Sequence, residues 1–119
     1  MFLILNHQKL NVYSSSRLLL VECYRFSKFL PVEEKFAMAS QIRRAALSVH
    51  LNIAEGSSKS SKAERKRYYE IARGSLIEID AAFDIADDLN YFFKFPQATL
   101  GISLRNCFSL LTGLINSNK

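Results

Sequence analysis

The sequence is poor in residues that interrupt helices, with four glycines and two prolines in 119 residues, so the few present mark element boundaries clearly. It has two cysteines, Cys23 and Cys107, and each lies inside an apolar run. This placement argues against a disulfide or a metal pair and predicts buried free thiols. Such thiols suit a reducing cytoplasm, where we expect the protein to reside.

Long hydrophobic runs are also missing. The opening MFLIL is too short for the core of a signal peptide and follows no basic residues, and no run approaches about 18 apolar residues. We therefore expect no export signal and no membrane span. A role at a membrane surface is disfavoured as well, because no helix combines strongly aromatic and basic faces.

The composition indicates a packed domain with a positive charge. Hydrophobic residues make up 49% of the chain, enough for a core in one domain covering residues 1–119. The formal net charge of +5 favours anionic partners such as RNA, DNA or an acidic membrane surface, although it does not require one.

Apolar residues recur at helical spacing in four segments, which predicts helices at about 14–30, 32–55, 61–92 and 97–116. Ser14 to Ser16 offer hydroxyls that would cap the first helix, and Glu33 and Glu34 would occupy the first turn of the second, where the helix dipole favours acids. Apart from the first few residues, no segment alternates as a strand would. The sequence therefore predicts an all-α, antiparallel, up-and-down four-helix bundle with short loops.

Three positions have specific expected roles at or within these helices. Gly56 would end the second helix in the left-handed conformation, and Ser61 with Glu64 forms a capping-box signature for the third. Gly74 lies inside the third helix at a cost near 1 kcal/mol relative to Ala, so a close backbone contact is expected there. The expected core stripe of this helix is Tyr68, Ile71 or Ala72, Ser75, Ile79, Ala82, Ala86, Leu89 and Phe93.

The second helix has apolar residues on two faces. The core stripe is Ile42, Ala46, Val49 and Ile53. Leu47 and Leu51 lie on roughly the opposite side, at about 100° per residue. A subunit interface is a natural candidate for this second face.

No pattern typical of an enzyme or a metal centre is present. The segment GSSKSS lacks the first glycine of a phosphate loop and joins two helices rather than a strand and a helix. His7 and His50 have no ligand partners nearby in the sequence, and Asp80, Asp84, Asp87 and Asp88 are more typical of a solvated face than of a cation site. We expect no catalytic residue, metal or cofactor, and no enzymatic activity.

The candidate nucleic-acid-binding residues are basic. Cations in the first turns of helix 61–92 oppose the helix dipole, which stabilises acids there by roughly 0.3–1 kcal/mol when exposed. Acids toward its end oppose the dipole as well. The candidate residues are Arg43, Arg44, Lys59, Lys62, Arg65, Lys66, Arg67 and Arg73.

Three interpretations of this inverted charge stay open. Phosphates would be favoured at the basic end of the helix. Alternatively, the acidic end of a neighbouring subunit, with Asp80, Asp84 and Asp88, would dock there in a head-to-tail ring. The third interpretation is a merely soluble surface, in which Lys66 and Glu70 pair at i,i+4.

Two segments of the sequence form recognisable signatures, QIRRAALSVHLNIAEGSS at residues 41–58 and YYEIARGSLIEID at residues 68–80. They resemble a known family of four-helix bundles, the 23S rRNA-intervening-sequence proteins. The residues that fill the two signatures are Gln41, Arg43, Arg44, Ser48, Asn52, Glu55, Gly56, Ala72, Arg73, Gly74, Ser75 and Glu78. From the residues themselves, we also expect Glu78 to pair with Arg43 or Arg44.

The resemblance implies a four-helix bundle that assembles into a barrel-like homopentamer without recognised catalytic activity. Members of the family are encoded inside intervening sequences of ribosomal RNA genes. A related branch, the accessory proteins of diversity-generating retroelements, uses a basic surface to engage nucleic acid and a reverse transcriptase. The resemblance therefore suggests nucleic acid, and a partner such as a reverse transcriptase, as ligands to consider.

Overall fold

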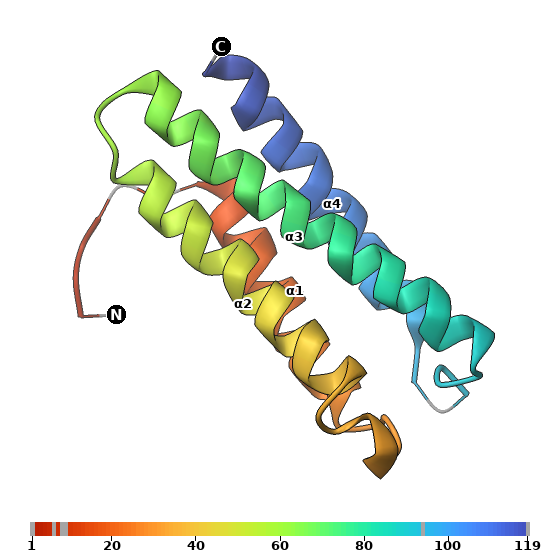
Figure 1. Ribbon diagram of the computed structural model, residues 1–119. Helices are drawn as coiled ribbons and strands as arrows, with labels where there is room; N and C mark the ends of the chain where they lie inside the picture. The colour runs from red at the N-terminus through yellow and green to blue at the C-terminus, as the bar shows by residue number, and fades with distance from the viewer. Residues whose placement is uncertain (1, 6, 8–9, 94, 119) are drawn as a thin grey trace.

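The computed structural model of the protein describes residues 2–5, 7, 10–93 and 95–118. Over these residues the chain forms no strand, and its elements are α1 (Asn11–Ser27), a 3-10 helix η2 (Val32–Glu34), α2 (Met38–Ser57), α3 (Lys62–Asp88) and α4 (Gln97–Ser117). The four long helices run up and down beside one another (Figure 1). The predicted all-α four-helix bundle is confirmed.

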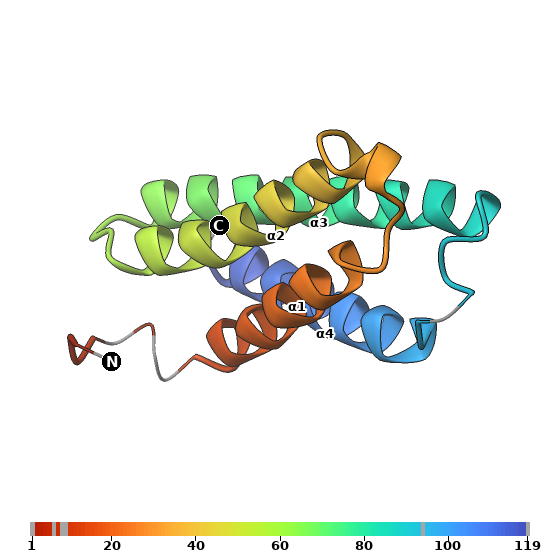
Figure 2. The same ribbon diagram turned by 90° about the horizontal axis from the view of Figure 1, so that it is seen from below.

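The bundle has two layers. Figure 2 shows α2 and α3 in one layer and α1 and α4 in the other. Each helix packs on two neighbours, in the order α1, α2, α3, α4 and back to α1, and the contact between α2 and α3 is the most extensive. This arrangement leaves each helix with one face toward the core and one face away from the bundle.

The core follows the predicted stripe on the second helix. In α2, Ile42, Ala46, Val49 and Ile53 are all buried. The buried apolar residues of α1 include Leu19, Cys23 and Phe26, and those of α4 include Leu100, Leu104, Cys107 and Leu111. In α3 the prediction was partly wrong. Its large buried residues are Tyr69, Leu76, Ile79 and Phe83, whereas Ile71, Leu89 and Phe93 are exposed. The cause is that α3 has apolar residues on two faces, so spacing alone did not identify the inner one.

Two helix starts differ from the prediction. Helix α1 begins at Asn11, so Ser14 to Ser16 lie inside it rather than capping it, and the N-cap position is Leu10. Glu33 and Glu34 lie in η2, separate from α2, which begins at Met38. The carboxylate of Glu34 still serves the start of α2, because its Oε1 accepts a hydrogen bond from the Met38 N–H (3.3 Å).

The end of α3 is set by Asn90 rather than by a residue near 92. Asn90 has a φ of 61°, in the left-handed region that Asn tolerates. The N–H of Tyr91 donates to the Ala86 carbonyl (2.8 Å), and the N–H of Asn90 donates to the Asp87 carbonyl (3.0 Å). This is the pair of hydrogen bonds that closes a Schellman motif, so the helix stops at Asp88.

Gly56 does not have the expected left-handed conformation, and the close contact expected at Gly74 is not made within the described part of the subunit. Helix α2 continues to Ser57, and no glycine among the described residues has a positive φ. Glycine is needed at position 56 because there is no room for a side chain: a Cβ there would lie 2.7 Å from the Cβ of Tyr68 on α3. At Gly74, by contrast, a Cβ would meet no atom within 4 Å. The close helix contact is therefore at Gly56.

Helix α4 passes a simple test for a membrane span, by length and composition alone. It has 21 residues and a mean hydropathy of 1.3 in its most apolar window, one third of which is buried in the bundle. It is apolar on average although its Ser, Asn and Thr residues interrupt any continuous run. Its residues Leu100, Leu104, Cys107 and Leu111 face the core, and the core helix of a bundle passes the same test.

Candidate functional site

The end of the bundle where α2 meets α3, here called the basic end, contains Lys59, Lys62, Arg65, Lys66 and Arg67. Helix α3 begins there as predicted, because Ser61 is its N-cap and its Oγ accepts a hydrogen bond from the Glu64 N–H (3.2 Å). The turn from α2 is short. These two features hold the five cations close to one another at the surface.

Arg65 has a structural role, because its side chain forms hydrogen bonds within the subunit. Its NH1 donates to the carbonyl oxygens of Lys59 (3.1 Å) and Ser60 (2.8 Å), and its Nε donates to the side-chain oxygen of Asn118 (2.9 Å). Asn118 in turn donates to the Leu114 carbonyl at the end of α4 (2.8 Å). Arg65 therefore ties three segments together and offers little free guanidinium to a ligand.

These contacts explain part of the inverted charge on α3. In an antiparallel bundle the N-terminus of α3 lies beside the C-termini of α2 and α4, whose carbonyls carry partial negative charge (Figure 1). A cation at the start of α3 interacts unfavourably with the dipole of α3 but favourably with the C-terminal carbonyls of α2 and α4. At the other end, Asp87 accepts a hydrogen bond from Gln97 (3.2 Å) in the first turn of α4. Neighbouring helices within the subunit thus supply partners that the sequence alone did not suggest.

Tyr68 lies between two of the cations. The Lys59 Nζ is 5.3 Å from the centroid of the Tyr68 ring, and the Arg67 guanidinium carbon is 6.0 Å from it. Lys59 also forms an ion pair with Glu55 (3.1 Å), and this hydrogen bond is the main cause that raises the pKa of the lysine. Tyr68 was not among the predicted site residues, although it directly follows Arg67.

Lys62 and Lys66 are the cations of the basic end with most freedom. Lys62 is exposed and Lys66 is half-buried. Across the described residues the single side-chain ion pair is Lys59 with Glu55, so the pair of Lys66 with Glu70 that belonged to the third interpretation does not form. These two lysines are therefore available to an external anion.

The other three arginines of the predicted set lie elsewhere. Arg43 NH1 donates to Ser27 Oγ on α1 (3.4 Å), and Arg44 is exposed on α2, about 20 Å along that helix from the basic end at 1.5 Å per residue. Arg73 donates to Thr112 on α4 (3.4 Å) and lies 6.0 Å from the Phe108 ring. The eight predicted residues do not form one cluster.

The expected ion pair of Glu78 with Arg43 or Arg44 is absent from the described part of the chain. Glu78 Oε2 instead accepts a hydrogen bond from Gln41 (3.1 Å), and Ser75 Oγ donates to Ser48 Oγ (3.0 Å). Asn52 donates to the Ser48 carbonyl (2.8 Å). The bonds of Gln41 with Glu78 and of Ser48 with Ser75 connect α2 to α3 along a polar groove, whereas the Asn52 bond lies within α2. All five residues fill positions of the two sequence signatures. Their first role is to hold the two helices together.

His50 is also a structural residue. Its Nδ1 lies 2.7 Å from the buried Ser16 Oγ, and its ring centroid lies 4.5 Å from that of the Tyr13 ring, with the two planes tilted by 35°. Burial, followed by the charges of Arg17 and His7, lowers its pKa. Nowhere in the described part of the chain do three or more His, Cys, Asp or Glu side chains gather as metal ligands would.

The candidate interface residues are exposed. Leu47 and Leu51 are 38% and 55% exposed on the outer side of α2, as the two-faced pattern predicted. Asp80, Asp84 and Asp88 are exposed on α3.

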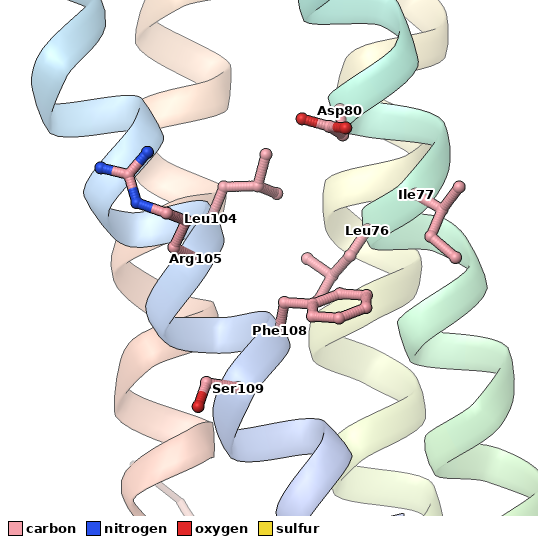
Figure 3. A pocket seen from close by; sticks show the side chains of 7 residues that line it. All are labelled: Leu76, Ile77, Asp80, Leu104, Arg105, Phe108 and Ser109. Atoms are coloured by element: carbon pink, nitrogen blue, oxygen red, sulfur yellow. The ribbon is translucent and has the colours of Figure 1, made fainter.

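A groove of about 330 Å³ runs between α3 and α4 beside Asp80 (Figure 3). Leu76 and Phe108 face each other in it, and Asp80 and Arg105 lie on opposite helices. Within the described chain these two charges form no ion pair. The groove combines an apolar floor with one charge of each sign.

Comparison with known families agrees with this architecture. The model of the 23S rRNA-intervening sequence protein family matches residues 8–113 of the chain. The chain therefore belongs to this family of four-helix proteins. No curated protein matches the sequence.

Proposed function

We propose that the protein is a non-enzymatic, cytoplasmic four-helix bundle that assembles into a homo-oligomeric ring and binds RNA or DNA through the basic end, without sequence specificity. The observation that carries the binding proposal is the group of cations at the basic end, where Lys59 and Arg67 lie against the Tyr68 ring and Lys62 and Lys66 have no ion pair in the described part of the chain. Lysine and arginine neutralise phosphates, and an aromatic ring between cations can stack on an unpaired base. No motif that reads base edges supports a sequence preference.

The proposal of a ring rests on the family resemblance, which implies that the ring is a pentamer. The surfaces that we propose for assembly are the outer apolar face with Leu47 and Leu51 and the acidic segment with Asp80, Asp84 and Asp88. A partner that processes nucleic acid, such as a reverse transcriptase, is compatible with the same basic end. The resulting function would be to present nucleic acid on a rigid scaffold.

Binding is tested by retention of labelled single-stranded RNA and DNA on filters across a salt series. We expect binding at about 50 mM salt that weakens steeply as salt rises. The double variant Lys62→Gln with Lys66→Gln should weaken binding to every sequence and lower the slope by roughly 0.7 for each phosphate of the single strand that is no longer neutralised. Lys28→Gln with Lys35→Gln removes the same charge from exposed positions outside the basic end and should bind as the parent does.

The two outcomes that would reject the binding proposal are clear. One is no retention of either nucleic acid near 50 mM salt. The other is an equal weakening of binding in the two double variants, because that would indicate a response to net charge rather than to a defined surface.

The second candidate function is an interaction protein whose charged surfaces serve only self-assembly. It is favoured by the intrasubunit contacts of Arg65 and by the exposed Leu47 and Leu51. Reversal of Asp80, Asp84 and Asp88 to lysine should then lower the mass measured by light scattering. An unchanged mass would remove the acidic segment from the assembly proposal.

A further inference from the structure

The outer surface of the α1–α4 layer contains a groove between the two helices. The groove measures about 450 Å³ and is lined by Ser14, Ser15, Leu18, Asn106, Ser109 and Leu110. Val21 and Arg25 lie three and seven residues after Leu18, so they share its side of α1, and Ile102 shares the side of Asn106 on α4. Leu18, Val21 and Ile102 are 54%, 43% and 54% exposed. A helix from another molecule could therefore pack here against aliphatic side chains of both α1 and α4.

The exposed charges of α1 and α4 all have the same sign. The chain has eleven acidic residues, of which α1 contains only Glu22, 7% exposed, and α4 contains none. The exposed charged residues of the two helices are Arg17, Arg25 and Arg105. Bases stack on aromatic rings, whereas this groove is lined by aliphatic and small polar side chains, so a nucleic acid fits it poorly. The complementary partner is an apolar protein surface that carries acids.

The C-terminal part of α3 has this composition. Ala81, Ile85 and Leu89 follow one another at steps of four residues, which places them in a row along one side, and Ile85 and Leu89 are each 50% exposed. Asp84 and Asp88 lie three residues after Ala81 and Ile85, so their carboxylates lie beside this row. Both are exposed, and neither forms an ion pair within the described chain. These five residues are here called the acidic ridge.

The groove and the acidic ridge belong to different layers of the bundle. Figure 2 shows α1 and α4 in one layer and α3, with α2, in the other. Among the described elements α1 contacts α2 and α4 but not α3. One copy of the chain can therefore use both surfaces at once, each with a different neighbour. Contacts between two different surfaces produce a ring when the rotation between copies closes.

We propose that the acidic ridge of one copy packs in the α1–α4 groove of the next copy, with its aliphatic row against Leu18 and Leu110 and its carboxylates toward Arg25. This contact rests on the assembly part of the proposed function and names the surface that receives the acidic segment. It leaves Lys62 and Lys66 uncovered. Assembly and nucleic-acid binding then do not compete for the same cations, as they would if the acidic segment docked on the basic end.

Charge reversal tests this contact, with the mass of the assembly measured by light scattering. Asp88→Arg and Arg25→Glu should each lower the mass toward that of one chain, because each places like charges in every contact. A chain with both substitutions restores opposite charges and should regain the parent mass. Arg17→Glu is the matched control on α1, because Arg17 lies close enough to His50 of α2 to affect its pKa, away from the groove. This control should keep the parent mass.

A second pair of substitutions separates this contact from docking on the basic end. Asp88→Arg with Lys66→Glu has the same net charge as Asp88→Arg with Arg25→Glu but should stay dissociated. Recovery of mass with Lys66→Glu and not with Arg25→Glu would reject the α1–α4 groove and leave the ring standing. A parent mass of 13.6 kDa, that of one chain, would reject the ring of the proposed function and this contact with it. If Arg25→Glu keeps the parent mass and loses RNA retention, the groove belongs to nucleic acid instead.

Cysteine cross-linking with a short bis-maleimide tests the contact without changing charge. Leu18→Cys and Ile85→Cys should each stay uncross-linked alone and cross-link when the two proteins are mixed. A chain with both substitutions should form a ladder on a denaturing gel, whose largest band gives the number of copies in the ring. The native Cys23 and Cys107 are fully buried and give a low background.

Two results of the cross-linking would overturn the proposal. One is the absence of a ladder from the chain with both cysteines while circular dichroism shows an intact fold. The other is cross-linking of Ile85→Cys alone as readily as in the mixture, because that would indicate a twofold contact between two acidic ridges.

Discussion

At the scale of single residues, the two glycines on either side of Tyr68 in the sequence have opposite surroundings. Gly56 is buried where α2 crosses α3, and the atom that a Cβ would meet is another backbone-attached carbon, 2.7 Å away. Such a carbon cannot move without moving its helix. The α2–α3 crossing therefore depends on the absence of one methyl group.

We expect Gly56→Ala to destabilise the protein by roughly 1–3 kcal/mol, the usual cost of overpacking. Gly113→Ala is the control, because it adds the same atom in open space on a helix and should stabilise by about 0.5–1 kcal/mol. Urea unfolding followed by circular dichroism measures both. Equal urea midpoints for the two variants would show that the stability change at Gly56 comes from helix propensity and not from the α2–α3 crossing.

His50 gives a second prediction at this scale. Burial lowers its pKa below 6.5, so the unfolded chain binds more protons than the folded protein between the lowered pKa and about 6.5. Stability from this group is therefore present at pH 7.5 and is lost as the pH falls through that window.

We expect the urea midpoint to fall as the buffer is changed from about pH 7.5 to about pH 5.5, a range that brackets the ordinary pKa of histidine. His50→Gln should be less stable overall, because the contact with Ser16 is altered, but it should lose this part of the pH dependence. The same slope in parent and variant would assign the effect to other groups.

At the scale of elements, Arg65 fixes the turn between α2 and α3 against the end of α4. Arg65→Ala removes hydrogen bonds to two carbonyls and to Asn118. Hydrogen bonds from a charged group contribute about 1.5–3 kcal/mol each, and the half-exposed position reduces this. We expect a net loss of roughly 1–2 kcal/mol.

Lys62→Ala is the matched control for Arg65→Ala, since it removes one charge from an exposed neighbour and should change stability by less than about 0.5 kcal/mol. Hydrogen exchange should also show faster exchange at the C-terminal turn of α4 in Arg65→Ala alone. Unchanged exchange there would mean that the contact with Asn118 does not hold α4.

The helices also show which features of the fold could be predicted from the sequence. Helical spacing and the cap at Ser61 predicted the number, order and approximate limits of the helices, because these depend on local chemistry. The inner face of α3 was not predictable, since Ile71 and Ile85 are as apolar as Leu76 and Ile79 and only packing distinguishes them. Asn118, which bonds Arg65, and Glu78, which bonds Gln41, lie far along the chain from their partners, so no local pattern could identify these two contacts.

At the scale of the whole molecule, the two thiols report on global unfolding. Cys23 and Cys107 are fully buried in the core, and burial raises the pKa of each thiol to about 12. The reactive thiolate is thus scarce and also shielded. Only an opening of the core exposes both.

We therefore expect a thiol reagent such as Ellman's reagent to react slowly with the native protein at pH 8, and with both thiols once urea unfolds the chain. The rate should follow the same midpoint as circular dichroism, as expected for opening that requires global unfolding. Fast reaction of one thiol in native buffer would indicate local opening of the α1–α4 layer.

Because α1 packs beside α4, the chain can be circularly permuted. Asn11 at the start of α1 and Asn118 after α4 both lie at the end of the bundle that contains the α2–α3 turn (Figure 1). Adjacent helices are about 8–10 Å apart, so a short flexible linker could join the two ends. A circular permutant joined in this way and reopened at the η2 segment should reach the same bundle. Its new termini would lie at the far end, leaving the α2–α3 turn clear of any fused tag.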